Sequence, residues 1–470
     1  MNTAGPTDPD HDATTAGSPE TRPDDVLDTT ALRREILRLA VPALLTLVAE
    51  PLFLLADTSI VGHLGTTPLA GLGVASTILG TAVGVFVFLA YATTALVSRR
   101  LGAGAEDAAL AAGLDGLWLA LLLGVGTGLV LGVGAPALVG LFGVDAAVAA
   151  QAVAYLQISA LGVPAMLAVL ALTGVLRGLQ DTRTPLVAAT LGFGANILLN
   201  TVLVYGAGLG IAGSAWGTVA AQTGMAVGLG IVVFRAARRH GARLRPHPGA
   251  VTRAAASGVP LLLRTLSLRA VVLLTTWVAA HYGATTLAAH QVAWTLWTFL
   301  SFALDALAIA GQALIGKALG AGDVVGTRAM TELMSRWSRG FGVVLGLALA
   351  ALSPVLPWLF TTDPGVRAAL TVGILVLAAG QPVAAQAFLL DGVLIGAGDA
   401  RWLARVGLLL LIVYLPVVGI LVAVQGPLEA AGSGAALAAI WAGFQVFMIG
   451  RAVVLTRRAR QDTWLVTGLQ

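Results

Sequence analysis

Two carboxylates, Glu50 and Asp57, lie seven residues apart in an apolar run that begins near Ile36. Seven residues make about two turns of an α-helix, so both side chains point to nearly the same side. If this helix crosses a bilayer, a carboxylate inside it costs at least ~2.5–3.5 kcal/mol. Because a cost of this size must be offset, we predict that this stretch has a function.

Asp57 lies towards the outer end of the run and has the chemistry of a coupling group. A carboxylate in a medium of low dielectric constant can bind and release a proton near neutral pH. Its occupancy can then shift a conformational equilibrium. Asp57 is therefore the candidate proton-coupling residue. The alternative is a carboxylate at the membrane interface, satisfied by water or by a helix end.

Polar side chains on other apolar runs could complete a site around Asp57. Asn196 and Asn200 are spaced i and i+4, so they share one helix face, and Thr218 lies on the next run. We expect these three residues and Glu50 to line one cavity with Asp57. The alternative is ordinary hydrogen bonding between neighbouring helices.

Charged residues also interrupt the apolar runs of the second half, at Arg264, Arg269, Asp305 and Asp391. Opposite charges buried together in a membrane pair rather than stand alone. We therefore expect Arg264 to pair with Asp305 or with Asp391. This network is either a structural salt bridge or a second substrate or coupling site.

Trp294 and Trp297 lie among other aromatic residues in the second half. Their rings could stack on a cationic compound, or they could pack against lipid near the interface. His63, His281 and His290 lie near predicted outer ends, where we expect them to be solvated, and they lack metal-ligand spacing. The chain has no cysteine, so we expect no metal site and no cofactor beyond a coupling ion.

The composition is that of a polytopic membrane protein. Of 470 residues, 57% are apolar and only 11% are charged, and the mean hydropathy is +0.90. Soluble proteins carry roughly 25% charged residues. We predict an all-α fold of twelve transmembrane helices, at 38–62, 68–97, 117–137, 150–176, 186–205, 212–234, 256–280, 286–315, 340–360, 369–395, 403–424 and 431–455.

Basic residues follow every second predicted span, whereas the alternate loops contain a single arginine, Arg367. This asymmetry places both termini in the cytoplasm of a multi-pass protein of the inner (plasma) membrane. The arginine-rich stretch 235–245 is one loop among several with the same bias. We therefore interpret it as a topology signal and expect no nucleic-acid partner.

An internal repeat relates the two halves at a shift of 218 residues. The matched positions are Pro42 and Pro260, His63 and His281, Gly65 and Gly283, 101–104 and 319–322, 174–176 and 392–394, and Asp181 and Asp399. Each repeat holds six predicted spans, so both halves enter the membrane in the same direction. This predicts two six-helix lobes related by a pseudo-two-fold axis along the membrane normal.

The repeat also sets the domain boundaries and separates scaffold from candidate function. We predict a disordered tail at 1–31, an N-lobe at 32–240, a linker at 241–253, a C-lobe at 254–458 and a tail at 459–470. Asp57 has Thr275 as its counterpart, and Glu50, Asn196 and Asn200 have Leu268, Tyr414 and Val418. The fold therefore does not require the polar groups at these positions.

The motifs resemble those of the multidrug and toxic compound extrusion (MATE) transporters, and are most similar to their DinF-like branch. The resemblance covers about 32–458. It rests on Glu50-Pro51 and Asp57–Gly65, on 174–183, on Leu304-Asp305-Ala306 and on 390–399. It implies two lobes around a central cavity. It also implies a secondary-active antiporter, acting as a monomer, that exports small cationic amphipathic compounds in exchange for inward H⁺, or for Na⁺ as the second choice.

The resemblance leaves two points open. Where the family often has Asp, this chain has Asn200, so a pair of carboxylates relaying a proton, or a Na⁺ site in the N-lobe, is less well supported. A flippase or an exporter of a lipid-linked or anionic metabolite is the alternative function, since Arg264 and Arg269 would suit an anionic headgroup. No cluster of histidines and acids suggests metal or nucleophilic chemistry, so we do not expect an enzyme.

Overall fold

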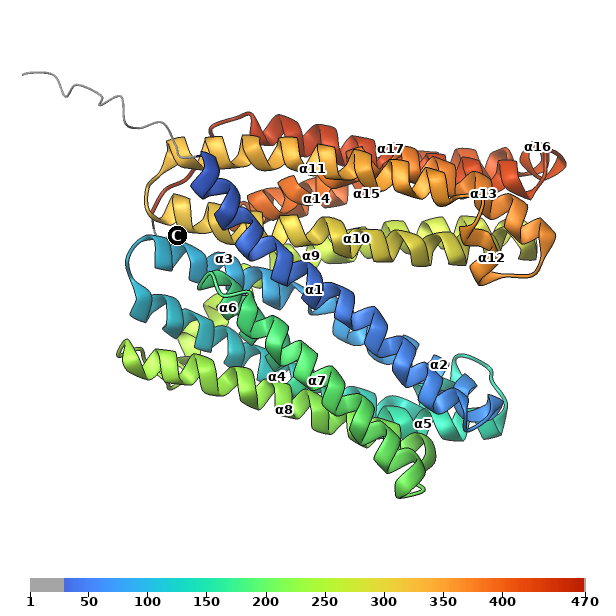
Figure 1. Ribbon diagram of the computed structural model, residues 1–470, viewed down its shortest axis with the longest axis horizontal. Helices are drawn as coiled ribbons and strands as arrows, with labels where there is room; N and C mark the ends of the chain where they lie inside the picture. Colours follow the sequence, from blue (N-terminus) through green and yellow to red (C-terminus); the bar gives the residue numbers. More distant parts are fainter. Residues whose placement is uncertain (1–28, 469–470) are drawn as a thin grey trace, which may run out of the picture.

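The computed structural model describes residues 29–468, apart from the side chains of Thr29, Glu50 and residues 52–55, and the regular elements in this range are all helices (Figure 1). Most of the predicted tail 1–31 lies outside the described residues, as do residues 469–470.

The first repeat forms the N-lobe. Its helices are α1 (Thr29–Gly62), α2 (Thr66–Val85), α3 (Phe88–Gly102), α4 (Glu106–Gly140), α5 (Ala146–Ala160), α6 (Val163–Gly178), α7 (Arg183–Thr201), the π-helical turn η1 (Val202–Gly206) and α8 (Gly210–Arg239).

The second repeat forms the C-lobe. Its helices are α9 (Pro248–His281), α10 (Gly283–Gly320), α11 (Val324–Leu352), α12 (Leu356–Phe360), α13 (Pro364–Ala379), α14 (Gln381–Gly396), α15 (Ala400–Ala423), α16 (Gln425–Ala430) and α17 (Ser433–Ala459).

Most of the predicted spans coincide with one helix or with one bent pair. In the described part of the chain, eight helices are long and apolar enough to cross a membrane, and ten are when each bent pair counts as one span. The two remaining predicted spans, 38–62 and 340–360, fall on α1 and α11. The predicted end at 360 is wrong for α11, which stops at Leu352 and is followed by a turn and the short α12.

Two bent spans occupy equivalent places in the lobes. α5 and α6 meet at 51°, and so do α13 and α14. The breaks lie at Gly162 and Gly380, which the 218-residue shift relates. A Cβ at Gly162 would lie 3.1 Å from a methyl carbon of Val219, and one at Gly380 would lie 2.1 Å from Oε1 of Gln445. The neighbouring helix thus occupies the space that a side chain at each break would need.

The duplicated loop glycines have a backbone reason. Gly65 and its counterpart Gly283 have φ values of 119° and 82°, and Gly104 and its counterpart Gly322 have values of 75° and 79°. These angles suit glycine, because a Cβ would clash with the backbone. The repeat at these positions therefore records shared turn geometry.

The two lobes converge at one end of the molecule and diverge at the other (Figure 1). They meet where α3 and α10 end, close to Arg99, Arg100 and Lys317; we name this the Arg-rich end, and the opposite end the outer end. α1 runs diagonally between the lobes and packs along both α7 and α10. α1 therefore contacts both lobes.

The contact between α3 and α10 is close enough to involve backbone. A Cβ at Gly102 would lie 1.9 Å from the carbonyl oxygen of Lys317, and a Cβ at Gly320 would lie 2.0 Å from that of Arg99. Gly102 and Gly320 are counterparts in the repeat. The Arg-rich end is thus closed by two glycines that each face the backbone of the other lobe.

The end of the described chain returns to this contact. Trp464 is 2% exposed, so the segment after α17 is packed. Arg99 donates from Nε to the Gly468 carbonyl oxygen at 3.2 Å and from Nη2 to that of Val466. The Gly468 amide donates to the Leu319 carbonyl oxygen at 3.1 Å. Residues 464–468 therefore bind the ends of both α3 and α10.

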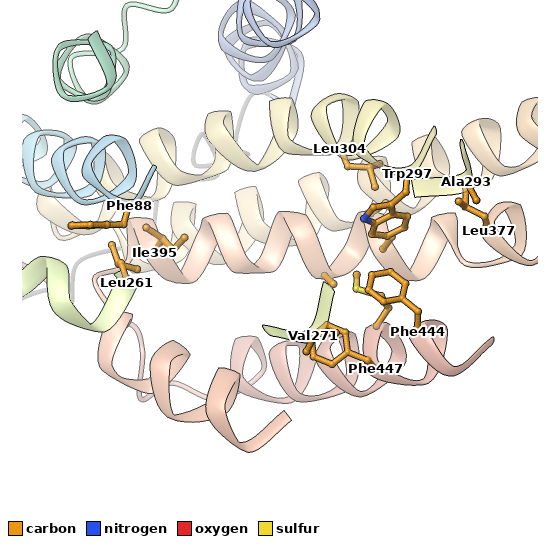
Figure 2. Packing of buried hydrophobic residues seen from close by; sticks show 14 of the residues in the cluster. Phe88, Leu261, Val271, Ala293, Trp297, Leu304, Leu377, Ile395, Phe444 and Phe447 are labelled. Atoms are coloured by element: carbon orange, nitrogen blue, oxygen red, sulfur yellow. The ribbon is translucent and has the colours of Figure 1, made fainter. Parts of the chain in front are cut away.

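Apolar side chains fill the interior and also cover the outer surface of the helices. Figure 2 shows Phe88 of α3 beside Leu261 and Ile395 of the C-lobe. Large apolar residues on α4 are more than half exposed, among them Leu129 and Val133. Exposed apolar side chains of this kind are suited to contact with lipid.

Candidate functional site

Asp57 is the centre of a buried hydrogen-bonded network in the N-lobe. The side chain is 4% exposed. It accepts hydrogen bonds from Nδ2 of Asn200 at 2.8 Å, from Oγ of Ser214 at 2.5 Å and from the hydroxyl of Tyr155 at 3.4 Å. All three donors are neutral, and no ion pair among the described residues includes Asp57. The carboxylate is therefore buried with hydrogen-bond donors but without a counter-charge.

The predicted partners extend this network. Asn200 Nδ2 also donates to Oδ1 of Asn196 at 3.0 Å, and Asn196 Nδ2 donates to Oγ1 of Thr218 at 3.1 Å. Both asparagines and the threonine are buried. The structure thus brings Asp57, Asn196, Asn200 and Thr218 together, from α1, α7 and α8. The predicted contribution of Glu50 lies outside the described side chains.

Sequence reasoning missed Tyr155 and Ser214. Ser214 belongs to a duplicated Ala-Gly-Ser triplet, so it resembled scaffold. Tyr155 has Gln151 at i−4 and Ser159 at i+4, a polar spacing that could have singled it out. A further contributor is Gly217, where a Cβ would lie 1.9 Å from Oδ1 of Asn200. A glycine there lets α8 approach the amide closely.

The outer end of α1 is tied to the N-lobe beyond Asp57. The Tyr205 hydroxyl, on η1, donates to the carbonyl oxygen of Ile60 at 2.6 Å. A carbonyl in the last turn of a helix has no partner within the helix, and Tyr205 supplies one. The α1 segment carrying Asp57 is therefore held by contacts on both sides of the network.

Asp391 is the centre of the C-lobe charge network. Arg264 donates from Nε to Oδ1 of Asp391 at 3.0 Å and from Nη2 to Oδ2. Arg451 approaches the same carboxylate at 3.2 Å. The expected pairing of Arg264 thus occurs with Asp391, whereas Asp305 forms no ion pair in the described part of the chain.

Sequence analysis did not single out Arg451 as a member of this network. The residue is 7% exposed and lies inside α17, two turns before the helix ends. Hydropathy alone does not show whether an arginine near the end of a span extends its charged group to the membrane surface or towards the interior of the protein, because its long side chain can reach either.

Asp305 connects the lobes. It accepts a hydrogen bond from the Tyr91 hydroxyl, on α3, at 3.2 Å. Arg177 of the N-lobe and Arg264 and Arg451 of the C-lobe act on it electrostatically. Asp305 therefore lies in a positive field and faces the space between the lobes.

A cavity of about 300 Å³ lies between α2 and α3 of the N-lobe and the C-lobe charge network. Asp305 and Asp391 line it, together with Arg264, Arg269 and Arg451. Arg269 reaches towards α2, since a Cβ at Gly84 would lie 2.9 Å from its Nη2. Arg269 has no ion-pair partner within the described residues. The cavity thus carries more positive than negative groups.

Trp294 and Trp297 both line this cavity and both belong to an aromatic cluster of the C-lobe. The Trp297 ring contacts that of Phe444 edge-on at 5.1 Å between centroids, and Trp294 contacts Trp441 at 6.2 Å. Trp297 is 5% exposed, and Figure 2 shows it among Leu304, Phe444 and Phe447. Their rings pack against protein rather than against lipid.

One histidine departs from expectation. His290 was predicted to be solvated, but it is fully buried, with Nε2 3.2 Å from Oγ1 of Thr276 and its ring 5.8 Å from that of Trp441. The reason is that α10 packs against α17 at this position, so His290 lies inside the aromatic cluster. His63 and His281 are exposed, as expected.

Loss of the Asp391 carboxylate should destabilise the C-lobe. In the Asp391→Asn variant, Arg264 and Arg451 lose their buried counter-charge, and breaking such a pair costs about 3–5 kcal/mol. We expect a lower thermal unfolding midpoint in detergent micelles. The matched variant is Asp305→Asn, which forms no ion pair and should lose less stability. Equal midpoints for the two variants would contradict this structural role of Asp391.

Two six-span halves, meeting at one end and holding buried charged sites within apolar helices, define a multi-pass membrane transporter of the two-lobe type. A sequence profile of the MatE family matches residues 42–202 and 260–424. The chain belongs to this family. It is therefore a transporter and not an enzyme, and efflux of drugs or toxic compounds is the activity of the family, as predicted from the motifs.

Individual relatives agree with this assignment. The chain is 31% identical to "Protein DETOXIFICATION 44, chloroplastic" of Arabidopsis thaliana, over 89% of this chain and 80% of that protein. It is 31% identical to "DNA damage-inducible protein F" of Escherichia coli (strain K12), over 63% of this chain and 65% of that protein. The predicted resemblance to the DinF-like branch is thus confirmed.

The fold is also that of solved transporters. The structure titled "Crystal structure of Vibrio cholerae MATE transporter VcmN in the bent form" superposes with a TM-score of 0.82. The match covers 93% of this chain and 99% of that chain, at 21% sequence identity. At this identity the likeness shows the fold alone, and it confirms the two-lobe architecture.

Proposed function

We propose that this protein is a secondary-active exporter that exchanges small amphipathic compounds for inward H⁺, with Asp57 as the proton-coupling residue. The observation that carries the proposal is the Asp57 network. A buried carboxylate without a counter-charge is costly unless it is hydrogen-bonded or neutralised, and a proton neutralises it directly. α1 contacts both lobes, so a change at Asp57 reaches the interface between them.

The chemistry of the network favours a proton over Na⁺. Hard cations prefer several oxygen ligands with charge among them. Here Asn200 presents its amide nitrogen to Asp57, and Ser214 and Tyr155 present hydroxyl donors. These groups stabilise a carboxylate by donation. The network therefore presents donors to Asp57 rather than the several oxygen ligands that a hard cation prefers, which leaves a proton as the better-supported coupling ion.

The lobes approach each other at the Arg-rich end, which we assign to the cytoplasm on the distribution of basic residues. This arrangement is the one expected of an outward-facing state. In the proposed cycle, the outward-facing protein releases its substrate and takes up a proton at Asp57. The protonated form then returns to the inward-facing state.

The test is efflux from proteoliposomes under separately imposed proton and sodium gradients, with a fluorescent amphipathic cation as substrate. We expect a proton gradient, acid outside, to drive efflux, and an equal sodium gradient at fixed pH to drive none above that of protein-free liposomes. Sodium-driven efflux that does not depend on Asp57 would overturn the proposed coupling.

Export of an anionic amphipathic compound is the second candidate function, and the charges of the central cavity favour it. Asp391 is neutralised by Arg264 and Arg451, and Asp305 lies in the field of Arg264 and Arg451. Arg269 remains as a cation on the cavity wall. An anionic group would offset this excess of positive charge, whereas the excess would repel the cationic substrates that the family resemblance implies.

Arg269→Gln separates the two substrate classes. If the substrate is anionic, loss of one cation from the cavity should weaken its binding by about fivefold, the ~1 kcal/mol of a charge-assisted contact. Competition of efflux by paired anionic and cationic amphiphiles of similar size measures this. If anionic amphiphiles compete with efflux equally well in the variant and the wild type, while cationic amphiphiles compete more strongly in the variant, the substrate is cationic. Arg367→Gln, at the outer end away from the cavity, is the matched control.

A further inference from the structure

A second inter-lobe cavity, distinct from the central one, lies at the Arg-rich end. Its volume is about 720 Å³. α3 contributes Arg99 and Arg100, the start of α9 contributes Arg253, and the start of α15 contributes Arg401. Because both lobes supply its walls, the cavity exists in this form only while the Arg-rich end is closed.

Two of the charged groups in the cavity are already satisfied. Arg99 is buried and donates from Nη1 to the Ala397 carbonyl oxygen at 2.5 Å and from Nε to that of Gly468. Asp399, the acid that lines the cavity, accepts from Nε of Arg458 at 2.7 Å. Asp399 is therefore already paired and does not neutralise the remaining arginines.

Arg100, Arg253 and Arg401 have no carboxylate in direct contact among the described residues. Arg100 donates to the Ala108 carbonyl oxygen at 3.2 Å, and none of the three forms an ion pair within residues 29–468. Asp115 attracts Arg100 and Arg253 repels it across the lobe boundary, the attraction being the larger. However, Asp115 is itself paired with Arg243 at 2.9 Å. Closing the Arg-rich end thus brings like charges together, and an anion between them would remove that cost.

Apart from the arginines, Ser257 and Asp399, the side chains that line the cavity are apolar. This apolar wall includes Ala92, Ala95 and Leu96 from α3, Ala256, Pro260 and Leu261 from α9, and Ile395 from α14. A small inorganic anion would use the cationic edge and leave this wall uncovered. A molecule with an anionic head and an apolar body would contact both, and at a cytoplasmic membrane face the molecule of that chemistry is a phospholipid.

We propose that this cavity binds an anionic phospholipid, with its phosphodiester held by Arg100, Arg253 and Arg401 and its apolar part against the α3–α9 wall. Because the site joins the two lobes, the bound lipid stabilises the state in which the Arg-rich end is closed. A ligand that binds only one of two conformations shifts the equilibrium towards it by mass action. The lipid therefore needs no contact with the Asp57 network or with the central cavity.

The test measures lipid binding and does not depend on transport. The full chain is purified in detergent, and retained phosphatidylglycerol is compared with phosphatidylcholine by native mass spectrometry. We expect a preference for phosphatidylglycerol. The Arg253→Gln/Arg401→Gln variant should bind it about 30-fold more weakly, at ~1 kcal/mol for each arginine near an anionic headgroup.

The matched control is Arg238→Gln/Arg239→Gln, which removes two exposed arginines at the end of α8 that do not line the cavity. It should bind phosphatidylglycerol as the wild type does. Equal losses in both double variants, or no loss in either, would overturn the site.

Two further measurements use the wild-type protein, so they do not depend on the folding of a variant. Raising the ionic strength should weaken phosphatidylglycerol retention and leave phosphatidylcholine unchanged. Glycerol 3-phosphate at the lipid concentration should leave the lipid bound. Displacement of the lipid by this soluble phosphate would identify a free phosphate as the ligand and overturn the lipid proposal. Phosphatidylglycerol retention that does not change with ionic strength would also overturn it.

Discussion

The Asp57→Asn variant should lose proton-driven efflux, down to the rate of protein-free liposomes. Asparagine keeps the size of the side chain but cannot release a proton, so occupancy of the site no longer follows the gradient. Its amide nitrogen is a donor and would face the donors of Asn200 and Ser214. A buried donor without an acceptor costs about 1–3 kcal/mol, so we also expect a lower stability. The measurements are efflux in proteoliposomes and the unfolding midpoint of the same preparation.

The matched control is Asp115→Asn in the same lobe. Asp115 is also buried, but it pairs with Arg243 at 2.9 Å near the Arg-rich end. This variant should lose stability and keep its response to the proton gradient. If Asp57→Asn were folded and exported substrate at the wild-type rate, the coupling role of Asp57 would be wrong. If Asp115→Asn alone lost coupling, the proton site would lie elsewhere.

Replacing Gly102 or Gly320 by alanine should open the Arg-rich end. A Cβ at either position would lie within 2.0 Å of a backbone carbonyl oxygen of the other lobe, so the helices must separate. Overpacking of this kind costs about 1–3 kcal/mol, which shifts a two-state equilibrium by about 5-fold to 150-fold. We expect a shift towards the state open at the Arg-rich end and a corresponding fall in export.

The chain contains no cysteine, so a single introduced one reports this opening. Ser257→Cys, on the cavity wall at the Arg-rich end, should react faster with a water-soluble maleimide when combined with Gly102→Ala or Gly320→Ala. Gly126→Ala is the matched control, since a Cβ at that position meets no atom within 4 Å. Equal reaction rates in all three backgrounds would contradict the proposed packing role of the two glycines.

The overall architecture followed from patterns that are local in the chain. Long apolar runs predict membrane helices because backbone groups in lipid must be satisfied within the helix. The 218-residue repeat predicts two similar lobes because equal sequences fold alike. These patterns did not predict helix boundaries that depend on packing against other helices. α11 ends at Leu352, and the broken spans at Gly162 and Gly380 read as continuous apolar runs.

The members of the Asp57 network that sequence reasoning found are those that share one helix face or that have a different residue type at the matched position of the repeat. Asn196 and Asn200 satisfy both criteria, and Asp57 satisfies the second. Ser214 satisfies neither, since it recurs as Ser433, whereas Tyr155 has Gly373 as its counterpart and was overlooked; both donate to Asp57. Their proximity results from how α5 and α8 pack against α1.

The amino-acid sequence was sufficient for the fold class, the two lobes, the intramembrane charges and the choice of Asp57, because hydrophobic cost and internal symmetry are properties of the chain itself. The pairing of those charges was not accessible in the same way. Arg264 pairs with Asp391 and not with Asp305, and Arg451 approaches the same carboxylate. Arg253 and Arg401 both belong to the C-lobe, and Arg100 of the N-lobe comes near them only where the lobes meet. These contacts join residues on different helices, and their distances depend on how the helices cross in three dimensions.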